Sequence, residues 1–258
     1  MKAIRCLFII ISSILTFQVS LLAQEAAEGQ PKYGWKNEIV GNLNLTQASF
    51  SNWEQGGENS LAWQINLTTN FTLDQEKDNW TNTGKVTLGY AKVGGNEARK
   101  SADELKLESV YNRKISQFLN PFVAVTAKTQ FLSGFQYDEN NKKTKISEFL
   151  DPGYFTQSVG VGYTPNEQIK TRLGIMVKET VTDIFPEESK IEPGITSVTD
   201  FKRKFEENVL FTSRMEIFSD LEAFDRIDIL WENNLTLKVS KFVNVNVNVD
   251  LLYDKDIS

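Results

Sequence analysis

Hydrophobic and polar residues alternate with a period of two along most of the chain beyond residue 35. This alternation predicts β-strands with one apolar face and one polar face. The most regular stretch alternates Val243, Val245, Val247, Val249 and Leu251 with Asn244, Asn246, Asn248 and Asp250. Such strands contain about 12 residues, about twice the usual length in globular proteins, whereas a tilted strand that crosses a bilayer needs about 9–11. Their length therefore indicates membrane-spanning strands.

The pattern divides the chain into eleven predicted strands. They cover residues 36–47, 60–73, 80–92, 104–115, 121–133, 153–163, 168–182, 194–204, 208–218, 226–239 and 242–253. The links between them alternate in length: 74–79, 116–120 and 164–167 are short, and 48–59, 93–103 and 134–152 are long. Short turns on one side and long loops on the other are typical of an outer-membrane β-barrel.

The strand at 194–204 is poorly patterned, and the alternation of the links is what predicts it. A different division of 183–225 would give ten strands. Eleven is an odd number, whereas bacterial single-chain barrels have an even number of strands. We therefore expect an all-β, antiparallel transmembrane β-barrel of 12 strands. On this interpretation 11 strands are present, the C-terminal strand is missing, and the sequence is a fragment.

The first residues have the features of a secretory signal peptide. Lys2 and Arg5 precede a short apolar run, and Ala23 offers a small residue for cleavage. A retained membrane anchor is the alternative. The predicted organisation is a signal peptide at 1–23, a short periplasmic segment at 24–35 and the barrel at 36–258. It predicts export to the outer membrane of a Gram-negative cell.

Composition excludes several kinds of chemistry. The 258 residues include no His and one Cys, and the formal net charge is −6. Without imidazole there is no Ser-His-Asp or Cys-His nucleophile and no His-bearing zinc or haem site. The acidic balance does not suit nucleic acid, whose phosphates need cations. We expect no enzyme activity, catalytic residue, metal site or cofactor, and no nucleic-acid partner.

Several stretches resemble an uncharacterised family of Bacteroidetes outer-membrane β-barrels, a domain of unknown function. They are GWK at 34–36, LNLTQASFSNWEQGGENS at 43–60, EIFSD at 216–220, IDILWEN at 227–233 and LLYD at 251–254. The chain is also similar to the broader salt-induced outer-membrane protein group. The resemblance covers nearly all of 33–254, and it implies one further strand that ends in an aromatic residue. It implies no known activity and no catalytic residues.

One predicted external loop contains an aromatic residue beside two glycines. Trp53, Glu54, Gly56 and Gly57 are the candidate binding residues of this loop. The Trp side chain could stack on a sugar or fold into the lumen. The alternative is a structural turn, in which Gly supplies positive φ and Trp belongs to the interfacial aromatic belt.

Polar residues occupy alternate positions of the strands, which we call one parity, and so lie on one face of the sheet. This face should line the lumen. The candidate lumen-lining residues are Asn44, Asn66, Lys106, Glu108, Lys128, Arg172, Lys178, Arg214, Glu232, Asn246 and Asn248. The same parity includes Lys85, Glu104 and Asp228. Mixed charges indicate a cross-bridged interior rather than a selectivity ring of one sign. Twelve strands tilted by about 40° give a backbone radius of roughly 12 Å, so the lumen is either a narrow channel or filled.

Three functions are therefore open. The first is a narrow passive channel for small polar solutes or ions. The second is a closed structural barrel, or one that binds ligands or envelope components through its external loops. The third is a soluble secreted β-sandwich. The expected partners of a barrel are outer-membrane lipid and the barrel-insertion machinery.

Overall fold

The computed structural model describes residues 33–48, 58–139, 141–224, 226–239 and 244–254. Residues Tyr33–Ser258 form one compact unit. The strands are β1 Gly34–Ala48, β2 Ser60–Asp74, β3 Asp78–Val93, β4 Arg99–Arg113, β5 Leu119–Thr129, β6 Gly134–Tyr137, β7 Lys143–Ser147, β8 Gly153–Tyr163, β9 Ile169–Val181, β10 Lys190–Glu206, β11 Val209–Asp220, β12 Ile227–Lys238 and β13 Asn244–Asp254. A single turn of 3₁₀ helix, Pro186–Glu188, precedes β10.

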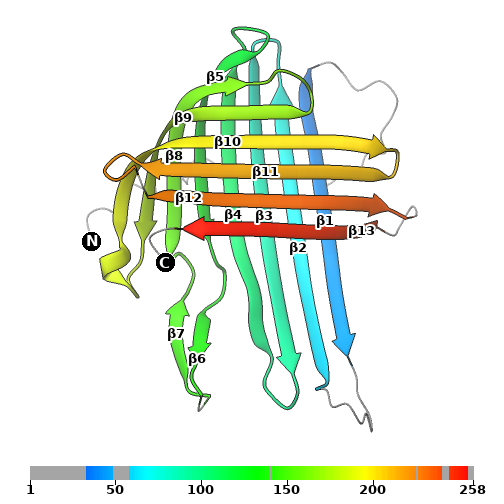
Figure 1. The fold of residues 1–258 in the computed structure, drawn as a ribbon, viewed down its shortest axis with the longest axis vertical. Helices are drawn as coiled ribbons and strands as arrows, with labels where there is room; N and C mark the ends of the chain where they lie inside the picture. Colours follow the sequence, from blue (N-terminus) through cyan, green and yellow to red (C-terminus); the bar gives the residue numbers. More distant parts are fainter. Residues whose placement is uncertain (1–32, 49–57, 140, 225, 240–243, 255–258) are drawn as a thin grey trace. The chain divides into compact units, whose positions relative to one another are not determined.

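Eleven of these strands form one antiparallel sheet in the order β1-β2-β3-β4-β5-β8-β9-β10-β11-β12-β13 (Figure 1). The predicted all-β antiparallel class and the predicted eleven strands are confirmed. The poorly patterned strand predicted at 194–204 is the central part of β10, so the division into ten strands is wrong. The predicted twelfth strand stays a prediction.

The links define two sides of the sheet. Those at 75–77, 114–118, 164–168 and 207–208 are short turns, and they lie on what we call the turn side. Those at 130–152 and 182–189 are longer and lie at the opposite ends of the strands, on the loop side. The predicted alternation of link lengths is thus present in these links, and it fails at the link between β3 and β4.

Several predicted boundaries are wrong. β5 ends at Thr129 rather than at residue 133, and β10 begins at Lys190 rather than at residue 194. The expected long link at 93–103 is a tight turn over 94–98, because Gly94 adopts a φ of +59° and β4 already begins at Arg99. The link at 134–152 contains the hairpin β6–β7, which the alternation did not predict. Gly34 and Trp35, expected in the N-terminal segment, belong to β1. The predicted signal peptide lies outside the described residues.

The sheet curls back on itself, because side chains of strands far apart in the strand order are in contact. Lys85 on β3 hydrogen-bonds Glu232 on β12, although six strands of the sheet lie between them. We call the face that carries these two residues the interior face and the opposite face the outward face. Close strand approach is possible where Gly160 on β8 faces Gly174 on β9, since a Cβ on Gly160 would lie 2.1 Å from the Leu173 carbonyl oxygen.

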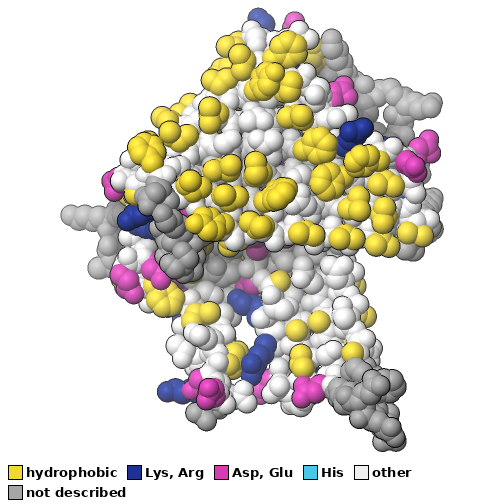
Figure 2. Space-filling model, in the orientation of Figure 1, with side chains coloured by type: hydrophobic (Ala, Val, Ile, Leu, Met, Phe, Trp, Pro, Cys, Tyr) yellow, Lys and Arg dark blue, Asp and Glu magenta, His cyan; other side chains and the backbone are white. Residues whose placement is uncertain are grey.

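The outward face is apolar and exposed. Leu43, Ile175 and Val249 are 70%, 61% and 61% exposed, and a hydrophobic side chain occupies most outward positions of the neighbouring strands. Figure 2 shows hydrophobic side chains over the face of β9–β13, with charged groups at its borders. The described part of the chain contains no helix long and apolar enough to span a membrane.

The two edge strands run in the same direction. Within the described ranges, β1 pairs with β2 alone and β13 pairs with β12 alone. Ten antiparallel steps separate them, so β1 and β13 both run from the turn side to the loop side. Direct pairing of the two edges would therefore be parallel.

Candidate functional site

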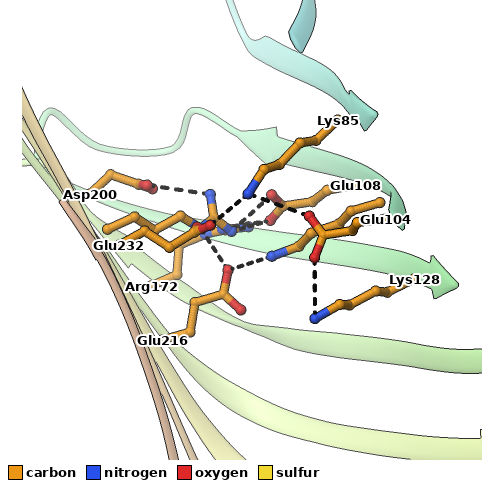
Figure 3. Close-up of polar contacts among 10 residues, drawn as sticks. Lys85, Glu104, Glu108, Lys128, Arg172, Asp200, Glu216 and Glu232 are labelled. Carbon is orange, nitrogen blue, oxygen red and sulfur yellow. Dashed lines mark hydrogen bonds and ion pairs between the residues drawn. The ribbon is translucent and has the colours of Figure 1, made fainter. Parts of the chain in front are cut away.

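Ten charged side chains meet on the interior face and form what we call the ion-pair network (Figure 3). They are Lys85, Glu104, Lys106, Glu108, Lys128, Arg172, Asp200, Arg214, Glu216 and Glu232. Five are basic and five are acidic, so the network has no net charge. They come from seven strands, β3, β4, β5, β9, β10, β11 and β12.

Glu108 is the most enclosed carboxylate of the network. Its oxygens lie 2.7 Å from Arg172 Nη2 and 2.8 Å from Arg214 Nη2, and its side chain is 10% exposed. Two guanidinium groups from β9 and β11 thus share one carboxylate from β4. A carboxylate so far removed from water is stable in its charged form because such hydrogen-bonded cations offset the lost hydration.

Arg214 connects the two halves of the network. Its Nε donates to Glu216 at 2.6 Å, and its Nη1 lies 3.3 Å from Asp200. Lys106 Nζ donates to the same Glu216 oxygen at 3.0 Å. Lys106 and Glu216 belong to strands that are distant in the sheet, so the network holds the curled sheet in one arrangement.

Lys85 extends the network to β12. Its ammonium group lies 2.8 Å from Glu232 and 3.4 Å from Glu104, and Glu104 in turn lies 3.4 Å from Lys128. These groups are more exposed than Glu108; Lys128, for example, is 45% exposed. The contact between β3 and β12 places charged side chains across the interior face.

A second, smaller cluster lies nearer the loop side. Lys178 Nζ is 2.6 Å from Asp228 and 3.5 Å from Glu192, and Lys190 is 2.9 Å from Glu192. The Lys178 ammonium group also lies 5.2 Å from the centre of the Phe218 ring, within the range of a cation–π contact. This cluster too balances two cations against two anions.

An apolar layer lies on the turn side of the network. Val110, Phe122 and Ala124 form a buried cluster, and Phe122 is 3% exposed. The Arg172 guanidinium lies 5.7 Å from the Phe122 ring centre, so charged and apolar layers are in direct contact. Together they occupy the interior side of β4, β5 and β9.

The charged side chains of the network pair with one another. Every cation of the network faces at least one carboxylate, so these side chains offer no ring of one sign for ion selection. Among the residues that the structure describes, no group of three His, Cys, Asp or Glu side chains could hold a metal ion.

The structure brings together seven of the predicted lumen-lining residues. Six belong to the ion-pair network and Lys178 belongs to the smaller cluster; the six are Lys106, Glu108, Lys128, Arg172, Arg214 and Glu232. Four asparagines lie elsewhere on the interior face, near the edges of the sheet. Asn66 accepts a bond from Gln64, Asn246 accepts one from Thr236, and Asn44 and Asn248 are exposed on β1 and β13. Trp53, Glu54, Gly56 and Gly57 lie outside the described residues.

Four charged residues of these clusters were not predicted from the sequence, namely Asp200, Glu216, Glu192 and Lys190. Glu216 has the parity of Arg214, two residues earlier, and this parity could have identified it. Asp200 and Glu192 lie on β10, whose alternation is weak because its outward positions include Ser197 and Thr199.

The loop side is held in place by polar contacts. Gln130 Nε2 donates to the carbonyl oxygens of Glu148, Asp151 and Pro152. The buried Asp151 carboxylate accepts hydrogen bonds from the Thr182 hydroxyl at 2.5 Å and from the backbone N–H groups of residues 183 and 184. The base of the β6–β7 hairpin is thereby fixed to the loop before β10.

Comparisons with known proteins give one partial family match and similarities to solved structures. The model of a family described as "Protein of unknown function (DUF3078)" matches residues 45–135. No curated protein gives a significant match. The translocator domain of the autotransporter NalP from Neisseria meningitidis is similar in structure with a TM-score of 0.40 and 10% identity, over 97% of this chain and 88% of that chain. The NanC porin is similar with a TM-score of 0.33 and 8% identity, over 80% of this chain and 98% of that chain. Because these scores are low, the function proposed below depends on this chain's own residues.

Proposed function

We propose that the chain is an outer-membrane β-barrel protein whose interior is filled, so that it is closed to solutes and acts through its loop side. The ion-pair network is the observation that carries this proposal. The alternative of a narrow open channel would need a path past these side chains. We also propose that the chain is related to the Bacteroidetes family of outer-membrane β-barrels and to the salt-induced outer-membrane protein group.

The outward face supports a membrane location. A soluble β-sandwich needs a second sheet packed on the first, whereas in the described part of the chain the second sheet is only the hairpin β6–β7. Strands of 11 to 17 residues are long enough to cross a bilayer. Their exposed outward aliphatic side chains would be covered by lipid.

Aromatic side chains near the strand ends support the same location. On the turn side, Trp35 and Trp80 lie 6.2 Å apart between ring centres. On the loop side, Trp63 stacks on Tyr90 at 5.4 Å. Aromatic girdles at both interfaces are typical of membrane barrels, because their rings tolerate the boundary between lipid and water.

The filled interior supports a barrel that is closed to solutes. The contact of Lys85 with Glu232 and that of Glu108 with Arg214 join opposite parts of the curled sheet. Removing the partner of the enclosed Glu108 carboxylate leaves an uncompensated charge, which costs about 3–5 kcal/mol. A solute would have to break several such contacts at once.

Planar-bilayer recording of the refolded protein tests the proposal. We expect no stepwise conductance from the wild type. We expect intermittent conductance from Glu108→Ala, because Arg172 and Arg214 then repel each other and attract water. Glu38→Ala is the matched control, since Glu38 is an exposed carboxylate on the interior parity of β1. Stable ohmic conductance steps from the wild type would overturn the proposal that the interior is closed to solutes.

A second variant keeps the experiment decisive if Glu108→Ala does not fold. The pair Lys85→Ala and Glu232→Ala removes more exposed members of the network and leaves Glu108 intact. Conductance in this double variant supports the proposal, and silence in both variants contradicts the filling role. A mature protein that stays in the aqueous phase without detergent would contradict the membrane location.

A further inference from the structure

A cavity lies at the turn side of the interior face, remote from the Asp151 contacts of the loop side. Its volume is about 520 Å³, which lies within the usual range for small-molecule sites. The residues at its charged wall are Lys202, Lys204, Lys238, Arg203, Glu167 and Glu207. The cations therefore outnumber the anions by four to two.

The strand register explains why these residues converge. Lys204 on β10 lies opposite Leu210 on β11, which lies opposite Thr236 on β12. Lys202 occupies the next interior position of β10, opposite Thr212, and Lys238 is the next interior position after Thr236 on β12. The backbone N–H of Lys238 bonds the carbonyl of Asn208 at 2.8 Å, which ties β12 to the β10–β11 turn. Three lysines thus share the interior face on β10 and β12, the two strands that flank β11.

These lysines differ from those of the ion-pair network. Each cation of the network faces a carboxylate, whereas Lys202, Lys204 and Lys238 make no ion pair within the ranges that the structure describes. Arg203 has the outward parity, and its guanidinium lies 5.0 Å from the Phe205 ring centre. The cavity therefore has an excess of positive charge that no side chain of the described chain neutralises.

We propose that this cavity binds a small phosphate-bearing anion from the turn side, the periplasmic side if the proposed function holds. Lys202, Lys204 and Lys238 supply the charge, and Gln168 and Asn208 line the wall with amide groups. A convergent cationic cleft attracts and concentrates anions. Because the lysines have the interior parity, the ligand is a soluble anion rather than a lipid headgroup on the outward face.

Calorimetric titration of inorganic pyrophosphate into the protein, refolded in a nonionic detergent, tests the site. We expect saturable binding that weakens as salt is raised. Lys204→Gln and Lys202→Gln should each weaken binding at least fivefold, and Lys204→Arg should restore it to within twofold of wild type. Lys77→Gln is the control, because Lys77 is an exposed lysine on the β2–β3 turn of the same side and the charge change is identical.

Each result of the titration decides for or against the site. No saturable heat with the wild type overturns the proposal, as does an equal loss in Lys77→Gln and Lys204→Gln. A second titration uses nanodiscs that contain phosphatidylglycerol: if this lipid abolishes pyrophosphate binding, the ligand is a headgroup and the soluble-anion assignment is wrong. Because the side chains changed are exposed, heat-modifiable gel mobility should be unaltered in each variant. The titration does not depend on whether the barrel conducts.

Discussion

Lys85 Nζ lies 2.8 Å from Glu232 Oε1 across the interior face, although 147 residues separate them in the chain. This contact joins β3 to β12 without any backbone pairing between the two strands. It therefore reports on the curled arrangement of the sheet rather than on local strand formation.

A double-mutant cycle should detect this contact as a coupling. Lys85→Gln and Glu232→Gln should together destabilise the protein less than the sum of the single changes, by about 1 kcal/mol, because both side chains are partly exposed. Urea unfolding in detergent measures the free energy of unfolding of the wild type, the two single variants and the double variant. Lys85→Gln combined with Glu38→Gln should be additive, and additivity in both cycles would contradict the bridge.

Charge on the outward face should be costly only where lipid covers it. Ile175→Lys, at an outward position that is 61% exposed, should destabilise the protein in phospholipid vesicles by about 2–4 kcal/mol. Ile115→Lys, at a 71% exposed position in the 114–118 link, should change the unfolding midpoint little. For a soluble protein both changes would be neutral, so equal midpoints for the two variants would contradict the membrane location.

The close approach of β8 and β9 should not tolerate a side chain at Gly160. A Cβ there would lie 2.1 Å from the Leu173 carbonyl oxygen and 2.5 Å from Gly174 Cα, so the backbone must shift. We expect Gly160→Ala to cost about 1–3 kcal/mol and to lower the refolded fraction on heat-modifiable gels. Gly41→Ala should refold like wild type, because nothing lies within 4 Å of a Cβ at Gly41.

Loss of the Asp151 carboxylate should loosen the loop side alone. Asp151→Ala leaves the Thr182 hydroxyl and two backbone N–H groups without their acceptor, a local cost of about 1–3 kcal/mol. Limited proteolysis should cut 182–189 faster while the global unfolding midpoint barely changes. Asp183→Ala, an exposed carboxylate in the same loop, is the control, and equal acceleration in it would contradict the role given to Asp151.

The sequence predicted the strands because alternation is a local property. Ten of the eleven strands of the large sheet alternate clearly enough to identify their two faces. The pattern of β10 is weak, and the alternation of links predicted this strand instead. The start of β4 was missed because Arg99–Ala102 contains no apolar alternation. The hairpin β6–β7 was missed because β7 is short and polar.

The partners within the ion-pair network could not be predicted in the same way. Parity places Glu108, Arg172 and Arg214 on one face, but their meeting depends on the tilt and curvature of the whole sheet. Asn44 has the same parity as these residues and lies exposed on an edge strand. Which residues of a face converge is a property of the curled sheet, and the period of two contains no information about it.

The equal numbers of cations and anions in the ion-pair network have a consequence for electrical behaviour. A transmembrane voltage exerts a force in proportion to net charge, and the ten side chains sum to zero. If the chain spans a membrane as proposed, a voltage can turn individual pairs, yet it cannot drive the whole layer toward either side. The interior should therefore stay occupied at both polarities, and any gating would have to come from a change in the contacts themselves.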